Sequence, residues 1–97
     1  MREYEVIIIV QPTLEEGARQ EVIERVTTWL THGEGEEAKP VANHWGMRSL
    51  AYPIKKHKQG YYVFYEARLD QARITDLERN LRYVESLLRF LVVRKED

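Results

Sequence analysis

Apolar and β-branched residues gather in short stretches that predict four β-strands. Residues 4–10 form the most apolar stretch and end at Gln11-Pro12, as expected of a central strand buried on both faces. Residues 61–69 and 87–94 have a similar composition and predict two further strands. Residues 36–51 alternate poorly between apolar and polar side chains and contain Pro40, which cannot donate a ladder hydrogen bond. We therefore expect an edge strand over residues 41–51.

Two other stretches repeat apolar residues at steps of three and four, which predicts helices. The first helix has one apolar stripe: Leu14, Ala18, Val22, Val26, Trp29 and Leu30. Thr13 stands three residues before Glu16, the spacing of a capping box, and Gly33 is the expected left-handed residue after the helix. Asp70 is the expected N-cap of the second helix, whose apolar face holds Ile74, Leu77, Leu81 and Val84.

The resulting order, βαββαβ, predicts an α+β fold of the ferredoxin-like, split-βαβ type. In this fold two helices pack on one face of a four-stranded antiparallel sheet. The 97 residues fit a single domain over 1–97. Residues 53–60 are expected to form the loop between the second and third strands.

Alternation along the strands separates a core face from an open face. The side chains predicted to face the helices are Tyr4, Val6, Ile8 and Val10, then Tyr61, Val63, Tyr65, Ala67 and Leu69, then Leu88, Phe90 and Val92. The open face receives the other parity, including the apolar residues Ile7, Ile9, Tyr62, Phe64, Leu91 and Val93. Monomeric domains seldom leave so contiguous an apolar surface uncovered.

Three interpretations of this open face compete. Tyr62 and Phe64 could stack the bases of single-stranded RNA. Aliphatic and aromatic residues together could instead form a protein interface, or the face could simply be solvated. The aliphatic share favours a protein interface, so we predict that the six apolar residues bind a partner protein and that the isolated chain is a monomer.

Charge limits any role in nucleic-acid binding. Fifteen Lys and Arg stand against sixteen Asp and Glu, a formal net charge of −1. A protein that grips a phosphate backbone unaided usually carries a cationic excess. RNA binding would therefore need a local cluster or a basic partner. Basic residues gather at 55–58, and others are dispersed over 79–95.

No pattern in the sequence predicts catalysis. There is no cysteine, and His32, His44 and His57 lie far apart without the spacing of metal ligands. Gly33-Glu34-Gly35 ends a helix, whereas a phosphate cradle opens one. No apolar run approaches the roughly 20 residues of a membrane span, and no signal peptide is evident. We expect a cytoplasmic protein that is not an enzyme and has no cofactor, metal, small-molecule substrate or membrane partner.

The segment Trp45-Gly46-Met47-Arg48-Ser49-Leu50-Ala51-Tyr52-Pro53-Ile54 resembles the signature of bacterial small-subunit ribosomal protein six. The first five residues, Lys58-Gln59-Gly60-Tyr61-Tyr62 and the segment 90–94 are also similar to that family, so the resemblance covers essentially the whole chain. One departure is Ser49, at a position that is often basic in the family.

The resemblance implies the fold derived above and a structural role in the small ribosomal subunit. It implies binding to the central domain of small-subunit (16S) ribosomal RNA, as a heterodimer with ribosomal protein eighteen. In this family the partner is small and strongly basic, so it could supply the positive charge that this chain lacks for RNA binding. The RNA contacts implied by the resemblance are Arg2, Arg48, Tyr52, Lys56, Arg82, Arg89 and Arg94.

The predicted topology makes the first and last strands neighbours, so we expect Arg2, Arg82 and Arg89 to converge near one edge of the sheet. Two other functions remain open. One is a small ferredoxin-like enzyme or ligand-binding regulator that dimerises through its open face. The other is a stand-alone single-stranded RNA binder that uses Tyr62 and Phe64.

Overall fold

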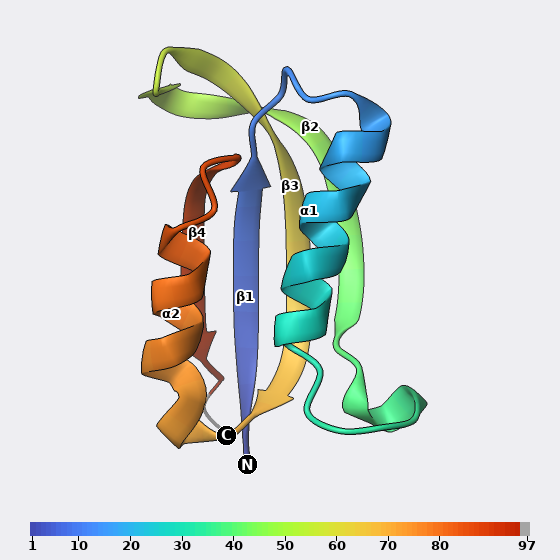
Figure 1. The fold of residues 1–97 in the computed structure, drawn as a ribbon. Coiled ribbons are helices and arrows are strands. Elements are labelled where there is room, and N and C mark those ends of the chain that lie inside the picture. Colours follow the sequence, from blue (N-terminus) through green and yellow to red (C-terminus); the bar gives the residue numbers. More distant parts are fainter. Residues whose placement is uncertain (96–97) are drawn as a thin grey trace.

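The structure, a computed structural model, describes residues 1–95. Four strands and two α-helices follow one another in the predicted order (Figure 1). They are β1 (Arg2–Val10), α1 (Glu16–Trp29), β2 (Val41–Ile54), β3 (His57–Leu69), α2 (Ile74–Arg82) and β4 (Leu87–Arg94). Short 3-10 helices, Glu36–Ala38 and Gln71–Arg73, lead into β2 and α2.

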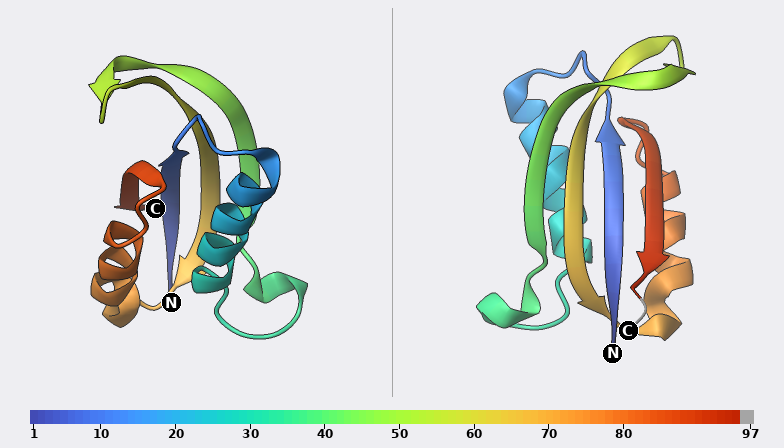
Figure 2. Two further views of the ribbon diagram at one scale, coloured as in Figure 1. Left: turned by 45° about the horizontal axis from the view of Figure 1, so that its top comes forward. Right: turned by 180° about the vertical axis from the view of Figure 1, so that it is seen from behind.

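The strands form one antiparallel sheet in the order β2-β3-β1-β4. Both helices lie on one face of this sheet, and the other face is open (Figure 2). β1 is an inner strand and β2 an edge strand that begins directly after Pro40. The ferredoxin-like fold class is confirmed.

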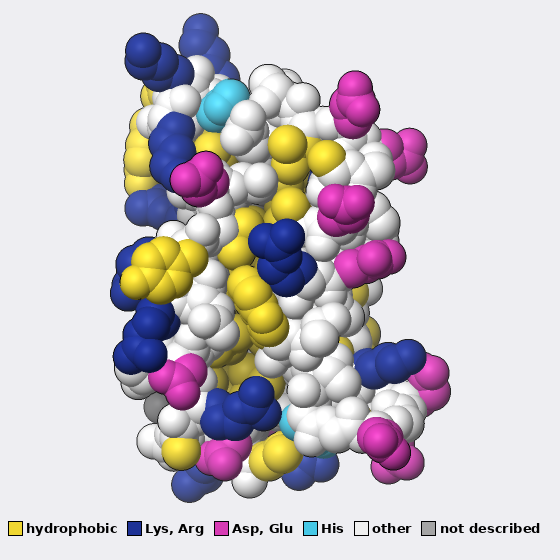
Figure 3. All heavy atoms as spheres, in the orientation of Figure 1, with side chains coloured by type: hydrophobic (Ala, Val, Ile, Leu, Met, Phe, Trp, Pro, Cys, Tyr) yellow, Lys and Arg dark blue, Asp and Glu magenta, His cyan; other side chains and the backbone are white. Residues whose placement is uncertain are grey.

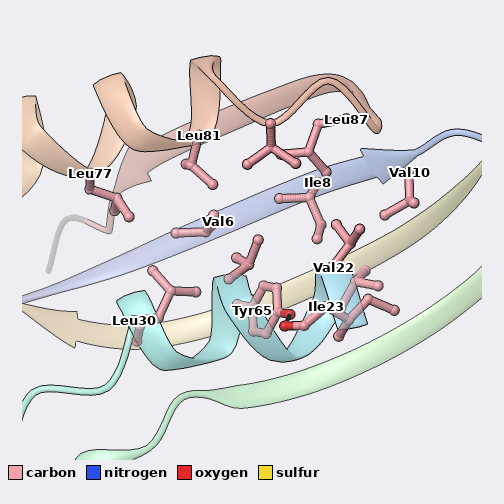
Figure 4. Close-up of a cluster of buried hydrophobic side chains, with 14 of the residues drawn as sticks. Val6, Ile8, Val10, Val22, Ile23, Leu30, Tyr65, Leu77, Leu81 and Leu87 are labelled. Carbon is pink, nitrogen blue, oxygen red and sulfur yellow. Dashed lines mark hydrogen bonds between the residues drawn. The ribbon is translucent and has the colours of Figure 1, made fainter. Parts of the chain in front are cut away.

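The core fills the layer between the sheet and the two helices (Figure 4). Val6, Ile8 and Val10 of β1 are fully buried in it, as alternation predicted. The same cluster contains residues in or just after the two helices: Val22, Ile23, Val26 and Leu30 at α1, and Leu77, Leu81 and Val84 at α2. Burial of this apolar surface is the main force that holds the sheet and helices together.

Tyr65 brings a polar hydroxyl group into the core. Its hydroxyl donates to the carbonyl oxygen of Ile23 at 3.1 Å and lies 3.1 Å from the hydroxyl oxygen of Thr27. Burial raises the pKa of Tyr65, because the charged phenolate would be poorly solvated there, although the Thr27 hydrogen bond lowers it in part. These bonds satisfy a hydroxyl that would otherwise be costly to bury.

Several local predictions about α1 were wrong. The N-cap is Glu15, without a side-chain cap, and Thr13 instead accepts a 2.6 Å hydrogen bond from the Gln11 amide. Ala18 is exposed, whereas the neighbouring turn buries Ile23. The helix ends at Leu30 in a right-handed conformation, so Gly33 is not its left-handed cap. The prediction for the start of the second helix agrees better with the structure. Asp70 accepts a hydrogen bond from the Ala72 amide at the turn that leads into α2.

The segment 53–60, predicted as a loop, is the outer part of a long hairpin. β2 continues to Ile54 and β3 starts at His57, so only Lys55 and Lys56 form the turn. Both have positive φ, 49° and 69°, as in a type I′ turn, whose twist matches that of the flanking strands. The prediction missed the turn because Asn and Gly, not lysine, normally mark this geometry.

A bulge in β4 corrects one predicted core position. The register between β1 and β4 shifts between Ile9 and Val10, and Val10 pairs with Leu87. Leu87 therefore joins the core, whereas Leu88 lies beside Gly60 at the start of the open face.

Candidate RNA and protein interfaces

The β2–β3 hairpin curls across the end of β1 toward β4 (Figure 2). At Gly60, which is buried, the hairpin packs directly against β1. A Cβ atom at this position would overlap Ile9 Cγ2 and lie 3.6 Å from Leu88 Cδ1. Glycine thus permits the two backbones to approach, and the hairpin tip reaches the start of β4.

Two contacts mark the place where the hairpin tip meets β4. Arg89 Nη1 donates a 2.7 Å hydrogen bond to the Tyr52 hydroxyl, and the guanidinium carbon lies 5.6 Å from the centre of the Tyr52 ring. Nearby, Lys55 lines a shallow hollow together with Arg82, Leu88 and Phe90. Residues from β2, the turn, α2 and β4 are thereby brought together.

We call this region the cationic end and define it by Arg48, Lys55, Lys56, Lys58, Arg82 and Arg89. Figure 3 shows Lys and Arg side chains on the side of the hairpin and α2, and acidic side chains over α1. The ion pairs between described residues are Lys39–Glu36, Arg79–Asp76 and Lys95–Glu66. Within residues 1–95, the cations of this end are thus not neutralised by an ion pair.

The separation of charge was already present in the sequence. Residues 11–40 hold seven carboxylates and three Lys or Arg, whereas residues 41–95 hold eleven Lys or Arg and five carboxylates. The net charge of −1 therefore combines an acidic segment, residues 11–40, with a basic segment, residues 41–95. Charge counted by segment shows that residues 41–95 are basic, although it does not show which of these cations lie together.

The predicted RNA contacts divide into two groups. Arg48, Tyr52, Lys56, Arg82 and Arg89 belong to the cationic end or lie beside it. Arg2 and Arg94 lie at the opposite end of the sheet, because Arg94 pairs with Tyr4 whereas Arg89 pairs with Ile9. The expected convergence of Arg2 with Arg82 and Arg89 is therefore wrong. Each residue of β1 adds about 3.3 Å along the strand, so its two ends lie far apart.

The open face holds the six apolar residues predicted as a partner surface. Leu91 and Val93 are 53% and 40% exposed, and Ile7, Tyr62 and Phe64 are half-buried. Ile9 is only 6% exposed, because the hairpin passes over it at Gly60. Ile9 thus supports this surface from below instead of offering it an exposed side chain.

Trp45 also belongs to the open face, a position that was not predicted from the sequence. Its ring lies parallel to that of Phe64, with centroids 5.3 Å apart, and stacks on Tyr62 at 6.4 Å. Arg48 lies over the same indole at 5.5 Å. Trp45 is the extra residue of a bulge, where the register shifts between His44 and Gly46 and Gly46 has a φ of 81°. A glycine inside a strand pattern was the available signal.

Other kinds of site find no support in the described part of the chain. No group of three or more His, Cys, Asp or Glu side chains within residues 1–95 is placed to hold a metal ion. His44 is the only one of the histidines with a side-chain partner among these residues, the Tyr61 hydroxyl at 3.0 Å. None of the helices described over this range has the length and apolar character needed to cross a membrane.

Comparison with known proteins gives one consistent result. The family model described as ribosomal protein S6 matches residues 3–94. The small ribosomal subunit proteins bS6 of Fusobacterium nucleatum and Heliobacterium modesticaldum are each 38% identical, over 99% and 100% of this chain and 100% and 99% of their own lengths. The crystal structure of 30S ribosomal protein S6 from Thermotoga maritima matches with a TM-score of 0.83 and 30% identity, covering 97% of this chain and 87% of that one. The chain therefore belongs to the ribosomal protein S6 family of the small ribosomal subunit.

Proposed function

We propose that this chain binds small-subunit (16S) ribosomal RNA in its central domain, as a heterodimer with ribosomal protein eighteen. Membership of the S6 family makes the chain a structural component of the small ribosomal subunit in the cytoplasm, not an enzyme.

The observation that carries the proposal is the cationic end. Lys55, Arg82 and Arg89 line one hollow there, and Arg48, Lys56 and Lys58 lie on the same hairpin as Lys55. None of the six has an ion-pair partner among residues 1–95. Keeping like charges together is unfavourable unless an anion neutralises them. A phosphate backbone does so, and the counterions it releases supply much of the affinity. We therefore propose that Arg48, Lys56, Arg82 and Arg89 contact phosphate, while Arg2 and Arg94 remain predictions from the resemblance alone.

The open face supports a protein partner at a second surface. Leu91, Val93 and Trp45 are exposed apolar side chains on one sheet face, beside Tyr62 and Phe64. A patch that combines aromatic and aliphatic residues suits the buried centre of a protein interface. A strongly basic partner there would also offset the negative charge of residues 11–40 when the complex binds RNA.

A three-way binding experiment tests this function. A transcript of the 16S central domain is titrated at physiological salt with this chain, with ribosomal protein eighteen, and with an equimolar mixture. We expect the mixture to bind at least about tenfold more tightly than either protein alone, about 1.4 kcal/mol. Tight, specific binding by this chain alone would favour the stand-alone RNA binder, and a mixture no tighter than ribosomal protein eighteen would refute the proposal.

A further inference from the structure

We propose that Tyr52 is a positioning residue for Arg89 and not itself an RNA contact. The Tyr52 hydroxyl accepts a hydrogen bond from Arg89 Nη1 at 2.7 Å, and its ring lies beneath the same guanidinium at 5.6 Å. The inference rests on the proposed function, because it concerns how the cationic end presents Arg89 to phosphate.

A tyrosine hydroxyl suits this task because it is neutral. A carboxylate in its place would orient Arg89 but would also cancel its charge, and phosphate attraction would be lost. Arginine carries five N–H donors in a fixed plane. One donor bonds Tyr52, so the remaining donors of a fixed guanidinium stay available for phosphate oxygens. Tyr52 thus reduces the side-chain freedom that Arg89 would lose on binding.

The contact is long-range, and the fold brings it about at a specific place. Tyr52 is in β2 and Arg89 is in β4, the two opposite edges of the sheet. Only the curl of the hairpin over Gly60 joins them. The bond therefore also fixes Lys55 and Lys56 of the turn relative to Arg82 and Arg89, which combines four cations into one surface.

The competing interpretation is that Tyr52 stacks directly on a base. Its side chain is exposed, and exposed tyrosines do stack on unpaired bases. The two interpretations differ in energetic coupling. A residue that acts only through Arg89 has no effect once Arg89 is gone, whereas a residue with its own RNA contact keeps its effect.

A double-mutant cycle makes this distinction. Tyr52→Phe, Arg89→Ala and the double variant are prepared in the full chain, each with ribosomal protein eighteen and the 16S central-domain transcript. Tyr52→Phe removes only the hydroxyl. We expect it to weaken binding about threefold, within the range for loss of one solvent-exposed hydrogen bond, with an unchanged salt slope. Arg89→Ala should weaken binding further and lower the slope by about 0.9.

The double variant should bind no more weakly than Arg89→Ala alone. Tyr83→Phe is the matched control, because Tyr83 is a well-exposed tyrosine at the end of α2, and it should bind as the parent does. Additive losses, or parent-like binding by Tyr52→Phe, would overturn the positioning role while leaving the proposed function intact. An ineffective Arg89→Ala would instead show that the cationic end is not the RNA surface, and the inference would fall with it.

Discussion

Replacing Lys55-Lys56 by Asn-Gly should make the protein more stable and a weaker RNA binder. Both lysines have positive φ, 49° and 69°. A left-handed conformation costs a side chain other than glycine about 1–2 kcal/mol, and asparagine tolerates it better than lysine does. The greater freedom of glycine in the unfolded chain offsets about 0.5–1 kcal/mol. The net gain is therefore about 1 kcal/mol, a rise in Tm of about 4–8 °C for a domain of this size.

The same double replacement removes two cations from the tip of the hairpin. If both contact phosphate, the slope of log affinity against log salt should fall by about 1.8 units. Thermal unfolding and a salt series of RNA titrations with ribosomal protein eighteen measure the two effects. Lys39→Asn is the control, since Lys39 precedes β2 at the other end of the molecule and pairs with Glu36.

Two results would contradict these expectations for the turn. A variant less stable than the parent would mean that the turn does not hold its lysines in the left-handed region. A more stable variant with an unchanged salt slope would mean that the turn does not contact phosphate, so its strain would need another explanation.

Gly60→Ala should lower the free energy of unfolding by about 1–3 kcal/mol, because the added Cβ overlaps Ile9. Gly17→Ala should raise the free energy of unfolding by up to about 1 kcal/mol, because Gly17 has open space around it in α1. Tyr65→Phe should cost about 1 kcal/mol near neutral pH. The raised pKa of Tyr65 contributes stability that is fully present below about pH 10. This contribution is lost as pH rises through the pKa of the folded state. Chemical denaturation at increasing pH should therefore show the parent losing stability more steeply than Tyr65→Phe. Leu91→Glu should weaken binding of ribosomal protein eighteen at least about tenfold in calorimetry with Tm nearly unchanged, because the side chain is exposed; unaltered binding would place the partner elsewhere.

The strands and the core were predictable from sequence because both follow from periodicity. Val6, Ile8 and Val10 alternate with residues that face away, and burial of one parity forces the register. The bounds predicted for β4, residues 87–94, match the structure. Here local pattern and global packing require the same arrangement.

The cationic end was not predictable in the same way. Its geometry depends on a hairpin whose Lys-Lys turn carries no usual turn signature, and on a backbone approach at Gly60 that no local pattern encodes. Antiparallel pairing also places Arg2 and Arg89 at opposite ends of β1. Knowing only that β1 and β4 are neighbours does not show this. The residue types were identified, but their grouping required the three-dimensional register.

Two double variants in complex with ribosomal protein eighteen show whether the cationic end is the RNA surface. Arg82→Ala with Arg89→Ala alters the cationic end, and Arg2→Ala with Arg94→Ala removes equal charge from the opposite end of the sheet. The measurement is the salt slope of binding to the 16S central-domain transcript. If the cationic end binds RNA, the slope should be lower by about one to two units for the first pair and unchanged for the second. The reverse result, with the slope lost only for Arg2 and Arg94, would contradict it.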